Sequence, residues 1–367
     1  MPKRLILLGG GHAHLRVLKH LIKHKPAELE VLLVSPSPWQ YYSGMLPGLL
    51  AGDYRLQDCR VDLASMARRA GVELITAALE YWVADQRLLG LSDGQTLHYD
   101  LLSVNTGSET QLGDLQTLGD VLLPIKPLDH FYQRSQQLFA AFVPGDLVSA
   151  AVVGGGAAGA EIAMAVQQAL LTRGLRPAIQ LITGESGVLA GHASAVQRRL
   201  MQLLQHKGIA VIASRASAIE PGKLQVGDKQ LSVDLLIATT GARAPDWLAA
   251  AGVSLAGDGF IAVNACQQSV SHPEVFAVGD VASRLDKPVE KSGVHAVKAG
   301  GVLRHNLVAA ASGRSLKLYK PRPVSLYLLN TADGKALLSW GPLTAHGAWV
   351  LQWKHWLDTT FIKAFND

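Results

Sequence analysis

Glycines spaced to bind the phosphates of a dinucleotide follow the expected strand 149–153. Gly154, Gly156 and Gly159 fill all three positions of the G-x-G-x-x-G pattern, directly before an expected helix. The first glycine permits a tight turn, the second lets a pyrophosphate approach the backbone, and the third lets helix and strand pack closely. The start of the helix adds free N–H groups and a partial positive charge. This segment is therefore predicted to bind a dinucleotide.

An altered copy of the same turn stands near the start of the chain, in "LILLGGGHAHL". Gly9 and Gly11 hold the first two glycine positions, and His14 replaces the third. The replacement asks the helix to stand slightly farther from the strand, but it leaves the phosphate-facing glycines intact. His12 and His14 would point about 200° apart on a helix, so they could share a metal ion only on non-helical backbone. We expect a dinucleotide site here and no metal site.

The elements that position the two turns are also duplicated. Residues 4–35 are expected to form strand, turn, helix and strand, and the same order recurs from 149 to 183. Each unit continues into an alternating segment typical of a strand meander, and each meander leads into a buried strand that ends in Thr-Gly. These pairs are Thr106-Gly107 and Thr240-Gly241. Two βαβ units of this kind predict doubly wound α/β domains.

Residues after the second strand of each unit could bind the ribose of a dinucleotide. Ser35 and Pro36 stand there in the first unit, and Thr183 and Glu185 in the second. An acidic residue at this place bonds ribose hydroxyls, so Glu185 slightly favours NADH over NADPH.

Composition excludes several other classes of protein. A chain of 367 residues is longer than one hydrophobic core usually serves, so we expect two domains or more. The net charge is +5, but no run of Lys or Arg is long enough to indicate a nucleic-acid partner. The two cysteines, Cys59 and Cys266, lie far apart and match no disulfide framework, zinc site or paired redox thiols. No apolar stretch approaches the ~18 residues that span a bilayer. We expect a cytoplasmic protein, with membrane association left open.

Two further segments bring in a family resemblance. "VFAVGDVA" ends a strand in Gly279-Asp280, and "LLIATTGARAPDWL" ends one in Thr240-Gly241. With the two glycine turns, these segments resemble the flavoproteins with two dinucleotide-binding domains, which include the pyridine nucleotide-disulfide oxidoreductases and type II NADH dehydrogenases. The resemblance covers roughly residues 3 to 311. It implies two Rossmann-like three-layer (β/β/α) domains, with an FAD domain (1–145 and 264–318) interrupted by an NAD(P)H domain (146–263) and followed by a small C-terminal region (319–367).

A narrower resemblance rests on "GGGHAHL", "YYSGMLPGLLAGDY" and "KSGVHAV". These segments are similar to the flavoprotein module that in some chains is fused ahead of selenophosphate synthetase, which implies a functional link to that enzyme. This chain departs from the module at His295, Lys298 and Ala299. The residues near the flavin ring are therefore less defined by the resemblance.

The resemblance also implies roles for individual residues. The FAD pyrophosphate would lie at Gly9 to Gly11, beside His12 and His14, and Asp280 would bond a ribityl hydroxyl. Asp280 could instead be the N-cap of a helix over "VASRL". The remaining residues expected near FAD are Ser35, Pro36, Leu46, Pro47, Thr106, Gly107, Gly279, Gly293 and Val294, with Leu46 and Pro47 over a ring face.

The nicotinamide cofactor would lie at residues 154 to 161 and near Glu185, Thr240 and Gly241. The catalytic candidates are Glu161, Lys291 and His295, and Glu161 could equally be an ordinary first-turn acid of its helix.

The implied activity is that of an FAD-dependent NAD(P)H oxidoreductase. Hydride would pass from NAD(P)H to flavin N5, and electrons then to a small acceptor, either a quinone or a selenium or sulfur compound. Two alternatives stay open: a flavin-binding sensor or assembly partner with little turnover, and a peripheral membrane type II NADH:quinone reductase.

The last segment, 349–365, places aromatic residues at helical spacing with lysines between them. Such a helix suits a membrane interface, and it equally suits packing on the body of the protein or in a homodimer.

Overall fold

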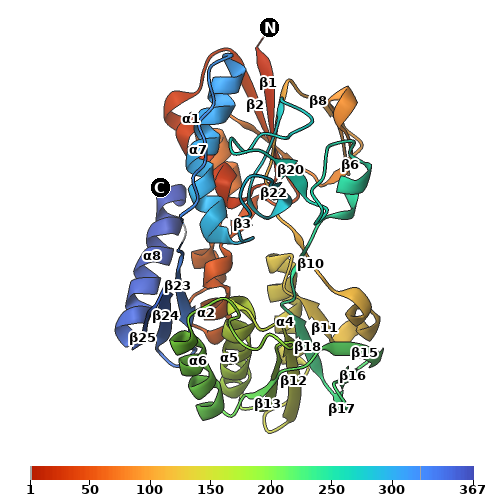
Figure 1. The fold of residues 1–367 in the computed structure, drawn as a ribbon, viewed down its shortest axis with the longest axis vertical. Coiled ribbons are helices and arrows are strands. Elements are labelled where there is room, and N and C mark those ends of the chain that lie inside the picture. The colour runs from red at the N-terminus through yellow and green to blue at the C-terminus, as the bar shows by residue number, and fades with distance from the viewer. Residues whose placement is uncertain (1, 323) are drawn as a thin grey trace.

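The computed structural model describes residues 2–322 and 324–367. Figure 1 shows two α/β domains stacked along the long axis, with the C-terminal segment along one side of both. This arrangement confirms the predicted fold class of two Rossmann-like domains.

The first domain is built on a five-stranded parallel sheet in the order β21-β9-β1-β2-β5. Its interior strands are almost wholly buried and aliphatic, as expected of a parallel sheet covered on both faces. The strands are β1 (Lys3–Leu8), β2 (Leu29–Ser35), β5 (Glu73–Thr76), β9 (Leu101–Val104) and β21 (Val275–Ala277).

Helices cover one face of this sheet and an antiparallel meander covers the other, which gives three layers. Gly300 of α7 lies so close to α1 that a Cβ atom would approach the Ala13 backbone to 2.8 Å. The layers consist of α1 (His12–His24), α3 (Leu63–Arg69) and α7 (Gly293–Ala311), and of β6 (Leu79–Val83), β7 (Leu88–Leu91) and β8 (Thr96–His98).

The second domain repeats this plan with the parallel order β11-β18-β12-β13-β14 and the antiparallel sheet β15-β16-β17. The parallel strands are β11 (Leu122–Pro124), β12 (Leu147–Val153), β13 (Arg176–Ile182), β14 (Ala210–Ile212) and β18 (Leu235–Ala238). The other elements are α4 (Leu128–Ala140), α5 (Ala157–Thr172), α6 (Ser194–His206), β15 (Ala216–Glu220), β16 (Lys223–Val226) and β17 (Lys229–Ser232).

The chain crosses between the domains at a two-stranded antiparallel connection, β10 (Glu109–Thr110) with β19 (Ala242–Arg243). β11 already belongs to the second sheet, so the chain enters that sheet before residue 146, where the boundary was expected. It also returns before residue 264, because Leu248 and Ile261 lie in the core of the first domain.

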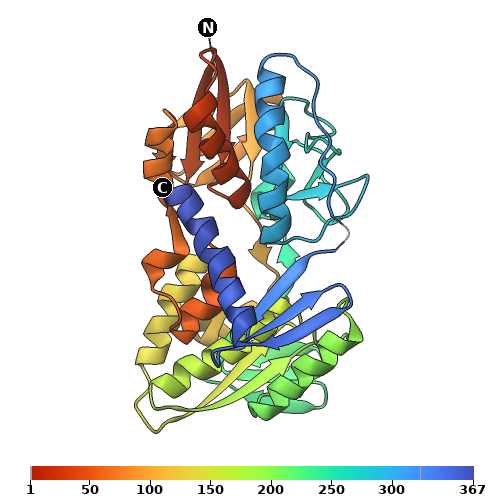
Figure 2. The ribbon, with the colours of Figure 1, turned by 90° about the vertical axis from the view of Figure 1, so that its left-hand side faces the viewer.

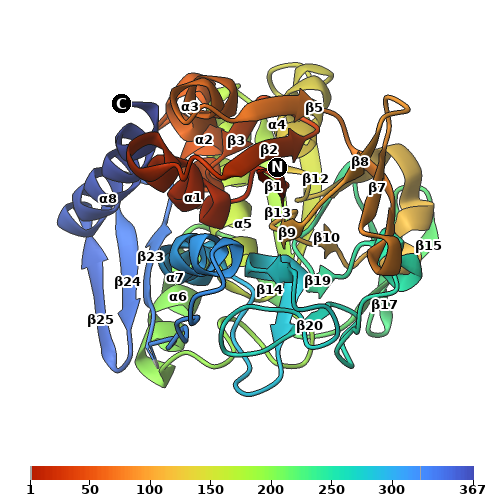
Figure 3. The same cartoon turned by 90° about the horizontal axis from the view of Figure 1, so that it is seen from above.

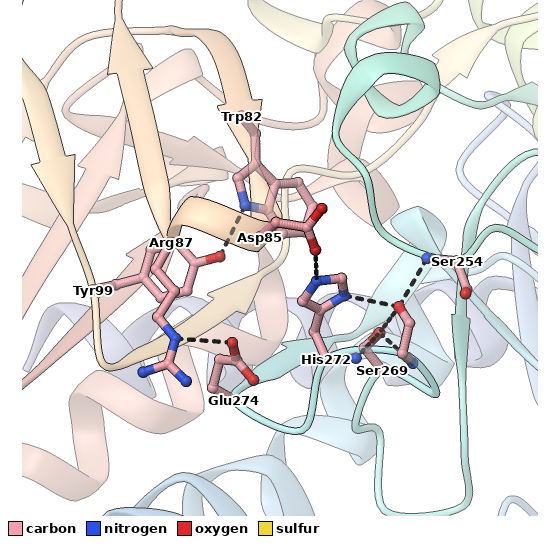
Figure 4. Close-up of polar contacts among 9 residues, drawn as sticks. Trp82, Asp85, Arg87, Tyr99, Ser254, Ser269, His272 and Glu274 are labelled. Atoms are coloured by element: carbon pink, nitrogen blue, oxygen red, sulfur yellow. Dashed lines mark hydrogen bonds and ion pairs between the residues drawn. The ribbon is translucent and has the colours of Figure 1, made fainter.

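Short elements lie between the longer elements of the first domain in the chain. They are β3 (Trp39–Tyr41), α2 (Leu46–Ala51), β4 (Arg60–Asp62), β20 (Ile261–Val263) and β22 (Ala282–Arg284). Among them, α2 packs against α5 of the second domain. Figure 4 shows how polar side chains hold the returning segment against the meander, with Asp85 bound to His272 at 3.1 Å and Arg87 to Glu274 at 3.0 Å.

The C-terminal region is a three-stranded antiparallel sheet followed by one long helix. These elements are β23 (Leu326–Asn330), β24 (Ala336–Trp340), β25 (Leu343–Gly347) and α8 (Ala348–Asn366). Figure 2 shows α8 running up beside both domains to lie near α1. Within residues 2–322 and 324–367, no helix has the length and apolar character needed to cross a bilayer.

Candidate functional site

The main cavity of the first domain lies at the carboxyl ends of its parallel strands, where ligands bind in open α/β sheets. Its volume is about 470 Å³. Of the residues expected to bind FAD, it is lined by Gly9, Gly11, His12, Ser35, Pro36, Thr106, Gly107, Gly279, Asp280 and Gly293. The start of α1 opens on the cavity, its N-cap residue Gly11 has no side chain, and its first turn holds no acid, which leaves it suited to a phosphate.

Asn105 explains why the first turn keeps its two glycines. A Cβ atom on Gly9 would lie 2.6 Å from the Asn105 carbonyl oxygen, and one on Gly11 would lie 2.3 Å from its Oδ1. The same Oδ1 accepts the Ala13 N–H at 3.0 Å, while Nδ2 donates to the Val278 carbonyl at 2.7 Å. One amide side chain therefore joins the turn to the strand that leads into Gly279.

His14 is wholly buried behind the turn and does not line the cavity. Its Nδ1 lies 2.6 Å from the Gly9 carbonyl oxygen, and its Nε2 lies 2.8 Å from Ser103 Oγ. At the matching place in the second turn, a Cβ atom on Gly159 would lie 1.8 Å from the Gly154 carbonyl oxygen. The His14 ring thus bonds to the Gly9 carbonyl, whereas Gly159 packs directly against the equivalent Gly154 carbonyl.

His12 differs from His14 because it faces the cavity. Its Nε2 is buried without a hydrogen-bond partner among the described residues, and its ring packs against Tyr42 and Phe361. Burial lowers the pKa values of both histidines to about 4, so both rings are neutral at pH 7.

Asp280 lies at the cavity wall in an ion pair. Its Oδ2 accepts from Lys126 Nζ at 2.7 Å and from Ser108 Oγ at 3.3 Å. The alternative role as a helix N-cap does not apply, because Ala282–Arg284 forms β22. Lys126 follows β11 of the second sheet, so this ion pair bridges the two domains.

The second glycine turn has the geometry that a dinucleotide site needs. Gly154 has φ of +135°, and its Cβ atom would lie 2.4 Å from Thr239 Oγ1, so a side chain there is excluded. A Cβ atom on Gly156, in contrast, would meet no atom within 4 Å. Gly156 is the N-cap of α5 and provides no side-chain cap. Since the fold itself does not require this glycine, the open space at the helix start fits a bound phosphate.

Two catalytic candidates lie by a second, smaller cavity of about 40 Å³ at the start of α7. Lys291 and His295 line it, together with Gln267 and Ser292. Lys291 Nζ donates to the Ala282 carbonyl at 3.1 Å and lies 3.5 Å from the centre of the Phe260 ring. Gln267 Oε1 and Ser292 Oγ are buried without a partner among the described residues.

Glu161 lies elsewhere, in the second turn of α5 beneath the C-terminal region. Its Oε1 accepts the Asn330 N–H at 2.7 Å. Burial raises the pKa of this carboxyl to about 7, although the positive charge of Lys354 and the Asn330 hydrogen bond act in the opposite direction. The group can therefore exchange a proton near neutral pH.

The remaining predicted residues are not gathered at the main cavity. Leu46 and Pro47 are buried in α2 and do not line it. Glu185 is exposed after β13, and the Thr240 hydroxyl donates to the Gln111 carbonyl beside the connection between domains.

Sequence reasoning missed Asn105, Lys126 and Lys354. Asn105 stands directly before the Thr-Gly pair of its strand, which was a usable signal. Lys354 and Asp358 stand four apart on the terminal helix, and this spacing allows an ion pair. Nothing in the sequence links Lys126 to Asp280.

Comparison with known proteins gives the family. The family model described as pyridine nucleotide-disulphide oxidoreductase matches residues 3–300. The chain belongs to this family. FAD and NAD(P)H are the cofactors of the family, and the cavity and the second glycine turn fit them.

Its relatives are distant and varied. A demethylphylloquinone reductase of Synechocystis is 24% identical over 92% of this chain and 87% of its own length. The assimilatory nitrate reductase electron transfer subunit of Bacillus subtilis is 24% identical over 76% of this chain, and ferroptosis suppressor protein 1 of Taeniopygia guttata is 26% identical over 65%. The matches span 36% and 64% of the lengths of these last two proteins.

A solved structure shares nearly the whole fold. The sulfide:quinone oxidoreductase of Aquifex aeolicus superimposes with a TM-score of 0.81 at 21% identity, over 99% of this chain and 91% of that one.

Proposed function

We propose that this protein oxidises NAD(P)H and passes the electrons through FAD to a small acceptor. The observation that carries the proposal is the open space at Gly156, at the uncapped start of α5, in a chain whose other glycine turn opens on a large cavity. When bound, FAD would supply the redox chemistry, because a flavin can take up a hydride from NAD(P)H and give up electrons to the acceptor.

Residues of the chain would bind and orient the two cofactors and would hold or release protons. The start of α1 and Asp280 would hold FAD, and the start of α5 would hold the NAD(P)H pyrophosphate. Glu161 would hold or release a proton on the nicotinamide side, with its pKa of about 7. Lys291 and His295, at the start of α7, would set the charge near the flavin edge. Glu185 favours NADH as the donor.

The first test uses Gly156→Val. The backbone at Gly156 is extended, and no atom lies within 4 Å of a Cβ atom placed there, so we expect the variant to fold and keep FAD while blocking the second dinucleotide. We expect anaerobic mixing with NADH or NADPH to bleach the wild-type flavin spectrum and to leave the variant unchanged. The matched control is Gly301→Ala, which also has open space for its Cβ atom. Purified protein without FAD, or equal bleaching of Gly156→Val, would refute the proposal.

The acceptor is tested by stopped-flow mixing of the reduced protein with quinones, disulfides and selenium compounds. Fast reoxidation by one class assigns the acceptor, and a selenium compound would favour the functional link to selenophosphate synthetase. Reoxidation no faster than slow oxygen leakage with every compound would favour the alternative of a flavin-binding sensor or assembly partner.

One observation favours the peripheral membrane quinone reductase as a second candidate function. One face of α8 is buried, while Trp349 and Trp356 on the other face are 56% and 61% exposed. Leu343, in the strand before this helix, is 59% exposed. Exposed indoles suit the interface of a bilayer.

We expect the full chain to co-sediment with liposomes and the Trp349→Ser/Trp356→Ser variant to lose this binding. A homodimer through α8 would instead appear as a doubled molecular mass in solution.

A further inference from the structure

The basic residues of this chain are concentrated in two segments that pack together. Residues 2–27 and 291–332 contain thirteen of the 34 Lys and Arg residues and none of the 29 Asp and Glu residues. The rest of the chain is therefore net acidic. The two segments include α1 and α7, which lie in contact where Gly300 meets Ala13.

The exposed cations of α1, of α7 and of the segment that follows α7 lie close to one another. Arg16 and Lys19 of α1 lie over the Phe365 ring at 5.8 and 5.7 Å, which places them beside the end of α8. The pKa of Arg16 is lowered mainly by burial and further by the positive charge of Arg304 in α7. The two guanidinium groups therefore lie near each other. We call the exposed residues Arg16, Lys19, Lys23, Arg304, Arg314 and Lys317 the basic surface.

Histidines lie among these cations. The rings of His20 and His24 lie 5.0 Å apart. Burial and the charges of Arg304, His24 and His305 lower the pKa of His20, and Lys317 and Arg314 add to the effect of burial on His305. Neither side chain has an acid among these neighbours. Uncompensated like charges destabilise the folded state, so a surface of this kind is best satisfied by an anionic partner.

The helices that carry the basic surface lie on the same side of the molecule as α8. Figure 2 shows α1, α7 and α8 all facing the viewer, and Figure 3, seen from above, places the same three helices together on one side. The C-terminal end of α8 lies against α1, because Lys19 Nζ donates to the Ala364 carbonyl. The helix with the exposed indoles and the helices with the basic surface are therefore neighbours.

We infer that the basic surface binds the anionic phosphate headgroups of a membrane, and that it does so while the α8 indoles enter the interface. A lipid surface offers both partners at once, apolar chains for the indoles and phosphates for the cations. Double-stranded DNA would match the cations but offers no apolar layer to Trp349 and Trp356. The inference rests on the proposed membrane contact of α8, and it adds the class of lipid and the residues that recognise it.

The test compares vesicles of phosphatidylcholine with vesicles of phosphatidylcholine and phosphatidylglycerol at about three to one. The variant is Lys23→Gln/Arg304→Gln, which removes one exposed cation from each helix. The matched control is Arg215→Gln/Lys229→Gln, which removes one exposed Arg and one exposed Lys from the β15-β16-β17 region of the second domain. NAD(P)H oxidation without vesicles and thermal unfolding verify that each protein is intact.

We expect the full chain to bind the anionic vesicles more tightly than the neutral ones, and Lys23→Gln/Arg304→Gln to lower the anionic affinity about thirtyfold. The control variant should match the wild type, and Trp349→Ser/Trp356→Ser should weaken binding to both kinds of vesicle. Equal binding to both vesicles, or an equal loss in the control, would overturn the inference while leaving the indole contact standing. DNA binding as tight as vesicle binding, with the same loss in the variant, would assign the surface to nucleic acid instead.

Discussion

At the scale of single residues, His14 shows how a histidine can stand where a dinucleotide turn ordinarily has glycine. Gly159 lets α5 pack tightly against the Gly154 carbonyl, whereas His14 bonds to the equivalent Gly9 carbonyl through its ring. The second ring nitrogen is bonded to Ser103, so the buried imidazole is fully paired. This arrangement supports a packing role for His14 behind the phosphate turn.

We predict that His14→Ala destabilises the protein. Loss of two buried hydrogen bonds and creation of a cavity should lower the free energy of unfolding by about 2–4 kcal/mol, measured by urea unfolding. His24→Ala, on the exposed side of the same helix, is the control and should change little. A loss below about 0.5 kcal/mol in His14→Ala would mean that the turn does not depend on this ring.

A second prediction concerns pH. Burial lowers the pKa of His14 from 6.5 to about 4. Below pH 6.5 this side chain is therefore protonated in the unfolded chain but stays neutral in the folded one. The free energy of unfolding should therefore be unaffected by this group above pH 6.5 and should fall as the pH drops toward 4. Replacement by glutamine, in His14→Gln, should remove up to about 1.4 kcal/mol per pH unit from this slope. Parallel curves for the two proteins would contradict the prediction.

A third prediction concerns Glu161. Its raised pKa of about 7 predicts an inflection near neutral pH in the rate of NAD(P)H-dependent turnover. Glu161→Gln should remove this inflection and lower turnover about hundredfold, with NAD(P)H binding nearly unchanged. If the inflection persists in the variant, the carboxyl has a structural role through the Asn330 N–H.

At the scale of elements, α8 is held to the body by a buried ion pair as well as by apolar contacts. Lys354 Nζ donates to Asp358 Oδ2 at 3.0 Å and to the Gly44 carbonyl at 2.7 Å, and both charged side chains are almost fully buried. The amphipathic pattern of the sequence does not reveal this, because charged residues are ordinarily assigned to the wet face of a helix. The wet face of α8 instead carries Trp349 and Trp356.

We predict strong coupling between these two residues. Lys354→Met or Asp358→Leu alone should cost about 3–5 kcal/mol, because each leaves the partner as an unpaired buried charge. The double variant should recover most of that loss, which a double-mutant cycle in urea would measure. Additive losses would show that the pair does not act as a unit.

At the scale of the whole molecule, the Lys126–Asp280 ion pair links the two domains at the wall of the expected FAD cavity. Asp280 lies in the short turn after β21 of the first domain, and Lys126 follows β11 of the second sheet. The orientation of the domains and the binding of FAD should therefore depend on each other.

We predict that Lys126→Met weakens FAD retention about tenfold, because Asp280 loses the donor that orients it toward the cavity. The measurement is FAD released on dilution and ultrafiltration of the purified protein. Lys229→Met, far from the cavity, should retain FAD like the wild type. Equal retention by both variants would show that Asp280 does not need Lys126.

Much of the fold was predictable because its signals are local. The glycine turns, the meanders and the strands ending in Thr-Gly or Gly-Asp each occupy a few adjacent residues whose hydrophobic period indicates the element. The structure places the crossings between the domains at other residues than the sequence predicted. The reason is that β11 pairs with β18 across more than a hundred residues, and nothing in the sequence of β11 selects that partner.

The sequence by itself determined the family, the fold and the positions of both glycine turns, because each depends on residue types at fixed short spacings. Only the tertiary structure decided that His14 lies behind the phosphate turn while His12 faces the cavity, and that Lys126 reaches Asp280. It also decided that α8 buries an ion pair and leaves indoles exposed beside a basic surface. These features depend on burial and on contacts between distant segments, and both exist only once the chain has packed.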